Sequence, residues 1–136
     1  MTSKLSPHTF NKGERLKSRT ILSRLFTEGQ SIKQYPLRLI WMPLDKNLSK
    51  YPVQFALSVP KRKFKKATQR NPIRRRIREA YRLQKHNIYD QLHDTDPQYA
   101  FIVIYMSNEP LSFAVINKAM KGLFDKWLKK RNSQNS

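Results

Sequence analysis

The chain has 136 residues, of which 38% are hydrophobic and 11% aromatic, so it suits one folded domain rather than a disordered basic tail. Its 28 Lys and Arg outnumber its 9 Asp and Glu, and the net charge of +19 indicates a polyanionic partner, because such an excess costs self-repulsion in a compact state. The absence of Cys excludes disulfides and thiolate chemistry, and the lack of a long apolar run or signal core predicts a cytoplasmic protein that binds no membrane.

The N-terminal part is expected to begin with an extended arm over residues 1–10, which contain Pro7 and show little periodicity. A short helix is predicted over 18–28, where Ser18 is a good N-cap and the following apolar residues recur at helical spacing. Gly29 tolerates a left-handed backbone, so we expect this residue to end the helix.

Alternating apolar residues predict strands over 37–41 and 53–59, which we expect to pair as a hairpin. The polar segment over 43–52 is typical of an exposed loop, and a further short strand can form near 31–34. The run over 99–105 is β-branched and apolar on both alternations, which predicts a central strand with a packed layer on each face.

A second helix is predicted from about 69–72 to the mid 80s, with Asn71-Pro72 at its start. An amphipathic helix over 112–130 and a disordered tail over 132–136 follow. We therefore expect one domain over 1–131 with an α+β fold in the order α-β-β-(β)-α-β-α, in which amphipathic helices pack against one small mixed sheet.

The charge is concentrated between residues 61 and 85, which hold 12 of the 28 Lys and Arg and one acid, Glu79. At helical periodicity one face of the second helix is apolar and consists of Ile73, Ile77, Ala80 and Tyr81. The opposite face is cationic and consists of Arg74, Arg75, Arg78, Arg82 and Lys85. Because like charges four residues apart destabilise a helix, this face is better explained as a surface for a polyanion than as a solvated face. The Lys-rich loop over 61–66 suits a phosphate backbone, and the lack of a DNA-binding motif favours RNA.

The chain carries a longer pattern around this helix, namely Leu57-Ser58-Val59-Pro60-Lys61-Arg62, then Arg70-Asn71, and then Ile77-Arg78-Glu79-Ala80-Tyr81-Arg82. This pattern resembles the signature of the bacterial ribonuclease P protein subunit, in which a strand ending in a basic pair leads to an Arg-Asn-Arg motif that opens a basic helix. Glu14-Arg15-Leu16, the helix end before Gly29 and the strand over 99–105 follow in the family's order. The resemblance covers residues 10 to 130.

The resemblance implies a ribonucleoprotein endonuclease that removes the 5′ leader from precursor tRNA and leaves a mature 5′-phosphate end. In this family a large RNA is the catalyst, and the protein supplies no catalytic side chain and no metal ligand. The implied partners are the catalytic RNA and precursor tRNA, and the implied cofactor is Mg²⁺ bound mainly by RNA, whose required concentration the protein lowers. The implied fold is ribosomal protein S5 domain 2-like, with a left-handed βαβ crossover instead of the usual right-handed one.

The resemblance also implies two groups of binding residues. The catalytic RNA would be bound by Lys61, Arg62, Lys65, Lys66, Arg70, Asn71, Arg74, Arg75, Arg78 and Arg82. The cleft for the single-stranded 5′ leader, between the sheet and the first helix, would include Phe26, Phe55 and Arg15.

The sequence departs from the family pattern at three positions. Pro72 stands where the second Arg of the motif is expected, which removes one guanidinium contact and can reset the helix start. Pro60 replaces a small residue before the basic pair, and Leu22 stands where the first helix often has an aromatic residue. These departures weaken the stacking surface expected for the leader.

Other chemistry finds little support in the sequence. His86, Asp90 and His93 have the spacing of one helix side, but without further ligands a solvated polar face is the preferred interpretation. Glu79 is interpreted as an intrahelical partner of Arg75 or Arg82, and the two Trp residues, Trp41 and Trp127, as core residues first. The alternative to a ribonuclease P subunit is a non-catalytic RNA-binding protein of ribosomal or chaperone-like type.

Overall fold

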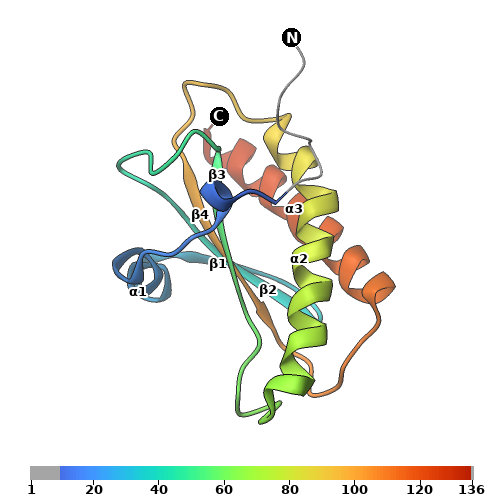
Figure 1. Cartoon of the computed structure of the whole chain (residues 1–136). Helices are drawn as coiled ribbons and strands as arrows, with labels where there is room; N and C mark the ends of the chain where they lie inside the picture. The colour runs from blue at the N-terminus through green and yellow to red at the C-terminus, as the bar shows by residue number, and fades with distance from the viewer. Residues whose placement is uncertain (1–9, 136) are drawn as a thin grey trace.

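The computed structural model describes residues 10–135, so most of the arm predicted over 1–10 lies outside the described residues. The described chain forms three α-helices, one short 3-10 helix and four strands, which confirms the predicted α+β class and element order (Figure 1). The elements are η1 (Lys12–Glu14), α1 (Arg19–Glu28), β1 (Gln30–Gln34), β2 (Leu37–Pro43), β3 (Val53–Ser58), α2 (Ala67–Tyr89), β4 (Tyr99–Tyr105) and α3 (Phe113–Asn135).

The four strands form one mixed sheet in the order β1-β2-β4-β3. β2 pairs with β1 and with β4 in antiparallel fashion, and β3 runs parallel to β4. The predicted hairpin between 37–41 and 53–59 is therefore wrong, because β4 lies between these two strands. β4 lies inside the sheet because its side chains are apolar on both faces. The order of the strands depends on pairing between distant segments, so a local pattern does not predict it. α2 connects the parallel strands β3 and β4, and the left-handed sense of this crossover stays a prediction.

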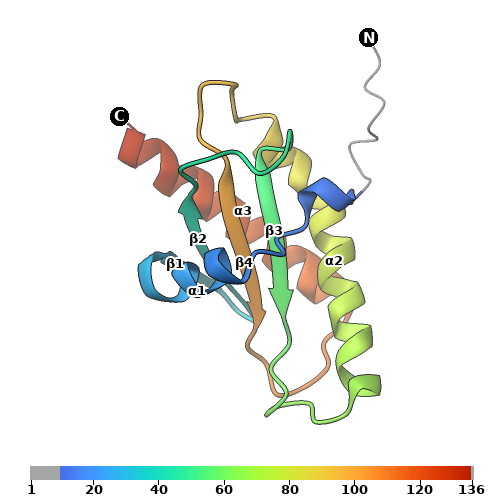
Figure 2. The ribbon, with the colours of Figure 1, turned by 60° about the vertical axis from the view of Figure 1, so that its left-hand side comes forward.

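Both faces of the sheet are covered, which confirms the prediction for the central strand. α2 and α3 pack on one face, and α1 packs on the other (Figures 1 and 2). Phe101 and Val103 of β4 belong to the larger core under α2 and α3. Ala100 and Ile102 point the other way and join a smaller core with Leu25 of α1. Successive residues of one strand therefore hold the two layers together.

α1 begins as predicted, because the Ser18 hydroxyl accepts a hydrogen bond from the backbone N–H of Ile21 at 3.3 Å. Gly29 ends the helix as predicted, with a φ of −72° that is not left-handed. The glycine is needed for space instead. A Cβ at this position would lie 2.4 Å from the carbonyl oxygen of Leu25 and 2.6 Å from Cγ2 of Ile40.

α2 begins at Ala67, four residues before the predicted cap Asn71, so Pro72 lies inside the helix rather than at its first position. The start is fixed by side chains instead of by this Asn-Pro pair. The Gln69 side chain accepts a hydrogen bond from the backbone N–H of Lys66 at 3.2 Å. Pro72 is the sixth residue of α2, beyond the first turn, so its missing N–H removes one hydrogen bond of the helix.

α3 continues through 132–135, where the sequence predicts a disordered tail. The Gln134 side chain donates a hydrogen bond to the Gln30 side chain at 2.9 Å, so this last turn contacts β1. Trp127 of α3 and Trp41 of β2 are 0% and 2% exposed and meet edge to face, which confirms them as core residues. Within the described part of the chain, no helix is both long and apolar enough to cross a membrane.

Candidate nucleic-acid interface

The outer face of α2 carries the arginine cluster that the sequence predicts. The four residues predicted to face inward are fully buried, namely Ile73, Ile77, Ala80 and Tyr81. On the opposite side Arg75 is exposed, and Arg74, Arg78 and Arg82 are half-buried. The predicted amphipathic pattern is confirmed for these residues, and Lys85 is the exception.

Lys85 does not lie on the outer face, because its side chain is only 3% exposed. Its Nζ donates to both carboxylate oxygens of Glu14, at 2.8 and 2.7 Å, and Glu14 is fully buried. The Tyr89 hydroxyl and the backbone N–H of Asn11 donate to the same carboxylate. Burial, with Tyr81 and Glu14 nearby, raises the pKa of Tyr89, so this hydroxyl keeps its proton. The prediction for Lys85 is wrong because its partner comes from a segment 71 residues earlier.

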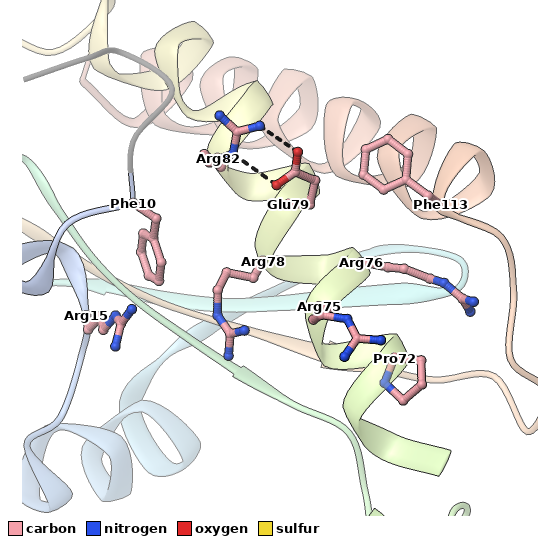
Figure 3. A pocket seen from close by; sticks show the side chains of 9 residues that line it. All are labelled: Phe10, Arg15, Pro72, Arg75, Arg76, Arg78, Glu79, Arg82 and Phe113. Atoms are coloured by element: carbon pink, nitrogen blue, oxygen red, sulfur yellow. Dashed lines mark hydrogen bonds and ion pairs between the residues drawn. The ribbon is translucent and has the colours of Figure 1, made fainter. Parts of the chain in front are cut away.

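This N-terminal segment, α2 and the start of α3 line a pocket of about 530 Å³ (Figure 3). We call it the arginine pocket, because five of its nine lining residues are arginines, namely Arg15, Arg75, Arg76, Arg78 and Arg82. The other four are Phe10, Pro72, Glu79 and Phe113. The guanidinium groups of Arg15, Arg78 and Arg75 follow one another along one side in Figure 3. Glu79 and Phe113 lie on the other side.

The positive charges of the pocket repel one another. Partial burial, together with the charges of Arg74 and Arg15, lowers the pKa of Arg78 from its ordinary value. An arginine nevertheless stays protonated in proteins, so the repulsion remains. A bound phosphate would relieve it, and planar guanidinium groups suit that anion.

A second hollow of about 220 Å³ adjoins the pocket and shares Phe10, Arg15 and Arg78 with it. It lies beside β3, where the backbone N–H of Leu16 donates to the carbonyl oxygen of Phe55 at 2.8 Å. Phe55 itself is 2% exposed, and its ring stacks on Tyr81 with the centroids 3.8 Å apart. Its ring therefore belongs to the core between the sheet and α2, although Phe55 also lines this hollow, and its place at the leader cleft stays a prediction.

Arg15 is exposed, and so is the third predicted cleft residue, Phe26. Its side chain is 59% exposed on α1. Because α1 covers the opposite face of the sheet from α2, the structure does not bring Phe26 into the arginine pocket (Figure 2). Arg15 lies in the segment of the chain that connects the pocket residue Phe10 to α1, the helix that carries Phe26.

The loop before α2 presents four exposed cations, namely Lys61, Arg62, Lys65 and Lys66. Lys63 and Phe64 anchor this loop, since the Lys63 Nζ donates to the carbonyl oxygen of Met106 and Phe64 is 6% exposed. Arg70 donates to the carbonyl oxygens of Phe64 and Lys65 at 2.8 and 3.0 Å. Arg70 therefore shapes the loop, while Asn71 is exposed on α2.

The interpretation of Glu79 as a partner of Arg82 is confirmed. The Arg82 Nε and Nη2 donate to the two carboxylate oxygens at 2.9 and 2.5 Å. These hydrogen bonds lower the pKa of Glu79, although partial burial opposes them. Sequence reasoning missed Phe10 and Phe113 as pocket residues, because the pocket joins three distant segments.

The described residues contain no group of three or more His, Cys, Asp or Glu side chains arranged to hold a metal ion. The donor set therefore does not fit a metal ion held by the protein. The dense positive charge of α2 also disfavours a cation there.

A model of the Ribonuclease P family matches residues 10–128. The chain belongs to the ribonuclease P protein family. It is 34% identical over 118 residues to the Ribonuclease P protein component of two strains of Porphyromonas gingivalis, and the match covers 85% of this chain and 85% of each relative. A Chlorobaculum tepidum protein of the same name is 34% identical over 88 residues, which are 62% of this chain and 56% of the relative. Family membership supports involvement in an endoribonuclease complex with an RNA partner.

Solved ribonuclease P proteins share the fold. The protein from Thermotoga maritima has a TM-score of 0.64 at 21% identity, covering 83% of this chain and 96% of that one. The Staphylococcus aureus protein has a TM-score of 0.64 at 18% identity, covering 83% and 94%. The mixed sheet with its helices on both faces is thus the fold of this family.

Proposed function

We propose that this chain is the protein subunit of ribonuclease P, in which a catalytic RNA removes the 5′ leader from precursor tRNA. The observation that carries the proposal is the arginine pocket, where five arginines from two distant segments converge on one space. A protein that needed these charges only for solubility would interleave them with acids, and Glu79 is the one acid among the lining residues. The family match over residues 10–128 supports the same role.

In this proposal the loop and α2 bind the catalytic RNA. The exposed loop cations Lys61, Arg62, Lys65 and Lys66 attract its phosphate backbone. The guanidinium groups on the outer face of α2, from Arg74, Arg75, Arg78 and Arg82, make the directional contacts. Arg70 acts in part through the loop that it holds, and Asn71 lies exposed on the same helix.

The 5′ leader would lie on the other side of the sheet, along α1. The exposed ring of Phe26 offers a stacking surface for an unpaired base. Arg15 would hold a leader phosphate where the N-terminal segment joins β3. Phe55 would support this surface from the core rather than stack on a base.

The catalytic groups in this proposal are those of the RNA. Mg²⁺ would be held mainly by RNA phosphates, because the described residues offer no carboxylate cluster for it. The protein would lower the Mg²⁺ requirement by neutralising phosphates that would otherwise repel one another.

Reconstitution tests the proposal. The protein is combined with a transcribed bacterial ribonuclease P RNA and a precursor tRNA that carries a 5′ leader, and cleavage is followed while Mg²⁺ is varied. We expect cleavage at a lower Mg²⁺ concentration than for the RNA alone, with a dependence on leader length. An unchanged Mg²⁺ requirement together with no effect of leader length would overturn the proposal and favour the non-catalytic RNA-binding protein.

A further inference from the structure

Glu79 is the feature of the arginine pocket that phosphate binding does not explain. Its side chain is 46% exposed and lines the pocket together with five arginines. A carboxylate in a site for phosphate alone weakens binding, because the two anions repel. The carboxylate therefore indicates a ligand that also brings hydrogen-bond donors.

The ion pair with Arg82 leaves the Glu79 carboxylate able to accept hydrogen bonds from such a ligand. A carboxylate accepts about four hydrogen bonds, and the Arg82 Nε and Nη2 supply two of them. The same pair fixes the direction of the carboxylate on α2. Arg82, three positions away on the same helix, lines the pocket together with Glu79.

The pocket also provides a stacking surface and enough room. Phe113 at the start of α3 is half-buried and lies on the same side of the pocket as Glu79 (Figure 3). The volume of about 530 Å³ falls in the range of small-molecule sites and admits one nucleotide. Unpaired RNA bases are recognised by stacking on aromatic rings and by hydrogen bonds to their Watson–Crick edges.

We propose that the arginine pocket binds one unpaired guanine nucleotide of the RNA partner. The guanine ring stacks on Phe113, its N1–H and N2–H groups donate to the Glu79 carboxylate, and its phosphate lies against Arg75 and Arg78. This inference rests on the proposed function, since it requires an RNA partner.

The choice of guanine follows from the arrangement of donors on the bases. Guanine presents two donors side by side on its Watson–Crick edge. Adenine and cytosine place an acceptor next to the amino group, and uracil places a carbonyl on each side of its N3–H. A carboxylate only accepts hydrogen bonds when ionised, so these neighbouring acceptors repel it.

The experiment measures binding of fluorescently labelled pentaribonucleotides to the whole protein by anisotropy. The probes are oligo(U) and the same oligomer with a central guanine, adenine, cytosine or inosine. We expect the guanine probe to bind about tenfold more tightly than oligo(U). The inosine probe, which lacks the N2 amino group, should lose part of this gain, and this comparison needs no protein variant.

Glu79→Gln then tests the residue. The variant keeps the size of the side chain and should bind the guanine, adenine and inosine probes with similar affinity, because stacking on Phe113 remains while the contact with the carboxylate is lost. Glu28→Gln is a matched control, because Glu28 also pairs with an arginine on its own helix, Arg24 at 3.1 Å, but lies outside the pocket. The control should keep the guanine preference. Phe113→Leu should weaken the binding of every probe that carries a central purine, because it removes the aromatic ring on which the purine stacks.

Equal binding of all probes to the wild-type protein would overturn the inference, and so would a guanine preference that survives in Glu79→Gln. If Glu28→Gln loses the guanine preference to the same extent, the loss is an effect of net charge, and this result would also overturn the inference. If reconstitution still shows the lower Mg²⁺ requirement, the proposed function stands although this inference fails.

Discussion

Glu14 and Lys85 connect the two segments that form the candidate site. Their side chains are 0% and 3% exposed, and burial of two charges costs free energy unless further hydrogen bonds satisfy them. Asn11 and Tyr89 supply those hydrogen bonds. The N-terminal segment is thereby fixed beside α2, and the next residue in the chain, Arg15, lines the arginine pocket. A buried pair outside the arginine pocket thus positions a residue within it.

Lys85→Met should lower the free energy of unfolding by about 3–5 kcal/mol, because it leaves the buried carboxylate of Glu14 without its counter-charge. Urea denaturation at neutral pH measures this loss.

The control is Lys121→Met, which breaks an ion pair of 3.2 Å whose side chains are 61% and 51% exposed. It should cost at most about 1 kcal/mol. The double variant Glu14→Gln with Lys85→Met should lose less than the sum of the two single losses. Equal losses for Lys85→Met and Lys121→Met would contradict the role of the buried pair.

At the scale of single elements, two glycines show why local rules need the tertiary structure. Gly29 ends α1 where a Cβ would lie 2.4 Å from a backbone oxygen of the same helix. Gly122 lies inside α3, where a Cβ would lie 3.0 Å from the side chain of Gln34. Backbone atoms cannot move aside as a long side chain can. The two glycine positions therefore differ in how well they tolerate an added methyl group.

Gly29→Ala should destabilise the protein by about 1–3 kcal/mol, because the added methyl group overpacks the contact between α1 and Ile40. Gly122→Ala should be neutral or stabilise by up to about 1 kcal/mol, since alanine favours the helix and Gln34 can shift. Thermal unfolding followed by circular dichroism compares the two variants. A change in stability of the same sign for both variants would contradict this explanation of Gly29.

The elements themselves follow from local patterns, and their assembly does not. Apolar periodicity places the strands, both amphipathic helices and the buried face of α2, because these signals are local. The place of β4 between β2 and β3 depends on pairing between distant segments. The start of α2 was misplaced because the local Asn71-Pro72 signal competes with contacts made by Arg70 and Gln69.

The candidate site is likewise only partly predictable from local sequence patterns. The arginines of α2 are predictable from one helix, whereas the pocket is not, because Phe10, α2 and Phe113 meet only in the folded chain. The burial of Phe55 and Lys85 is not predictable from one segment for the same reason. Their burial is decided by Tyr81 and by Glu14, which lie far away in the sequence.

At the scale of the whole molecule, most of the few acids are held in ion pairs. Among the described residues, six of the nine acids lie in ion pairs, namely Glu14, Glu28, Asp45, Glu79, Asp96 and Asp125. One of these six acids lies between residues 61 and 85, where 12 cations gather. The excess charge is therefore concentrated on the loop and α2 and produces a directional field there.

This distribution predicts how salt affects RNA binding. Each phosphate neutralised on binding releases counterions, so the double variant Arg74→Ala with Arg78→Ala should flatten the dependence of log K on log salt by about 1.5 and weaken binding to ribonuclease P RNA. The circular dichroism spectrum should stay unchanged, because both side chains lie on the outer face of α2. The matched control, Lys118→Ala with Lys129→Ala, removes the same charge from exposed positions of α3. If net charge alone drives binding, both variants will change the slope equally, whereas a binding face on α2 requires that only the arginine variant does.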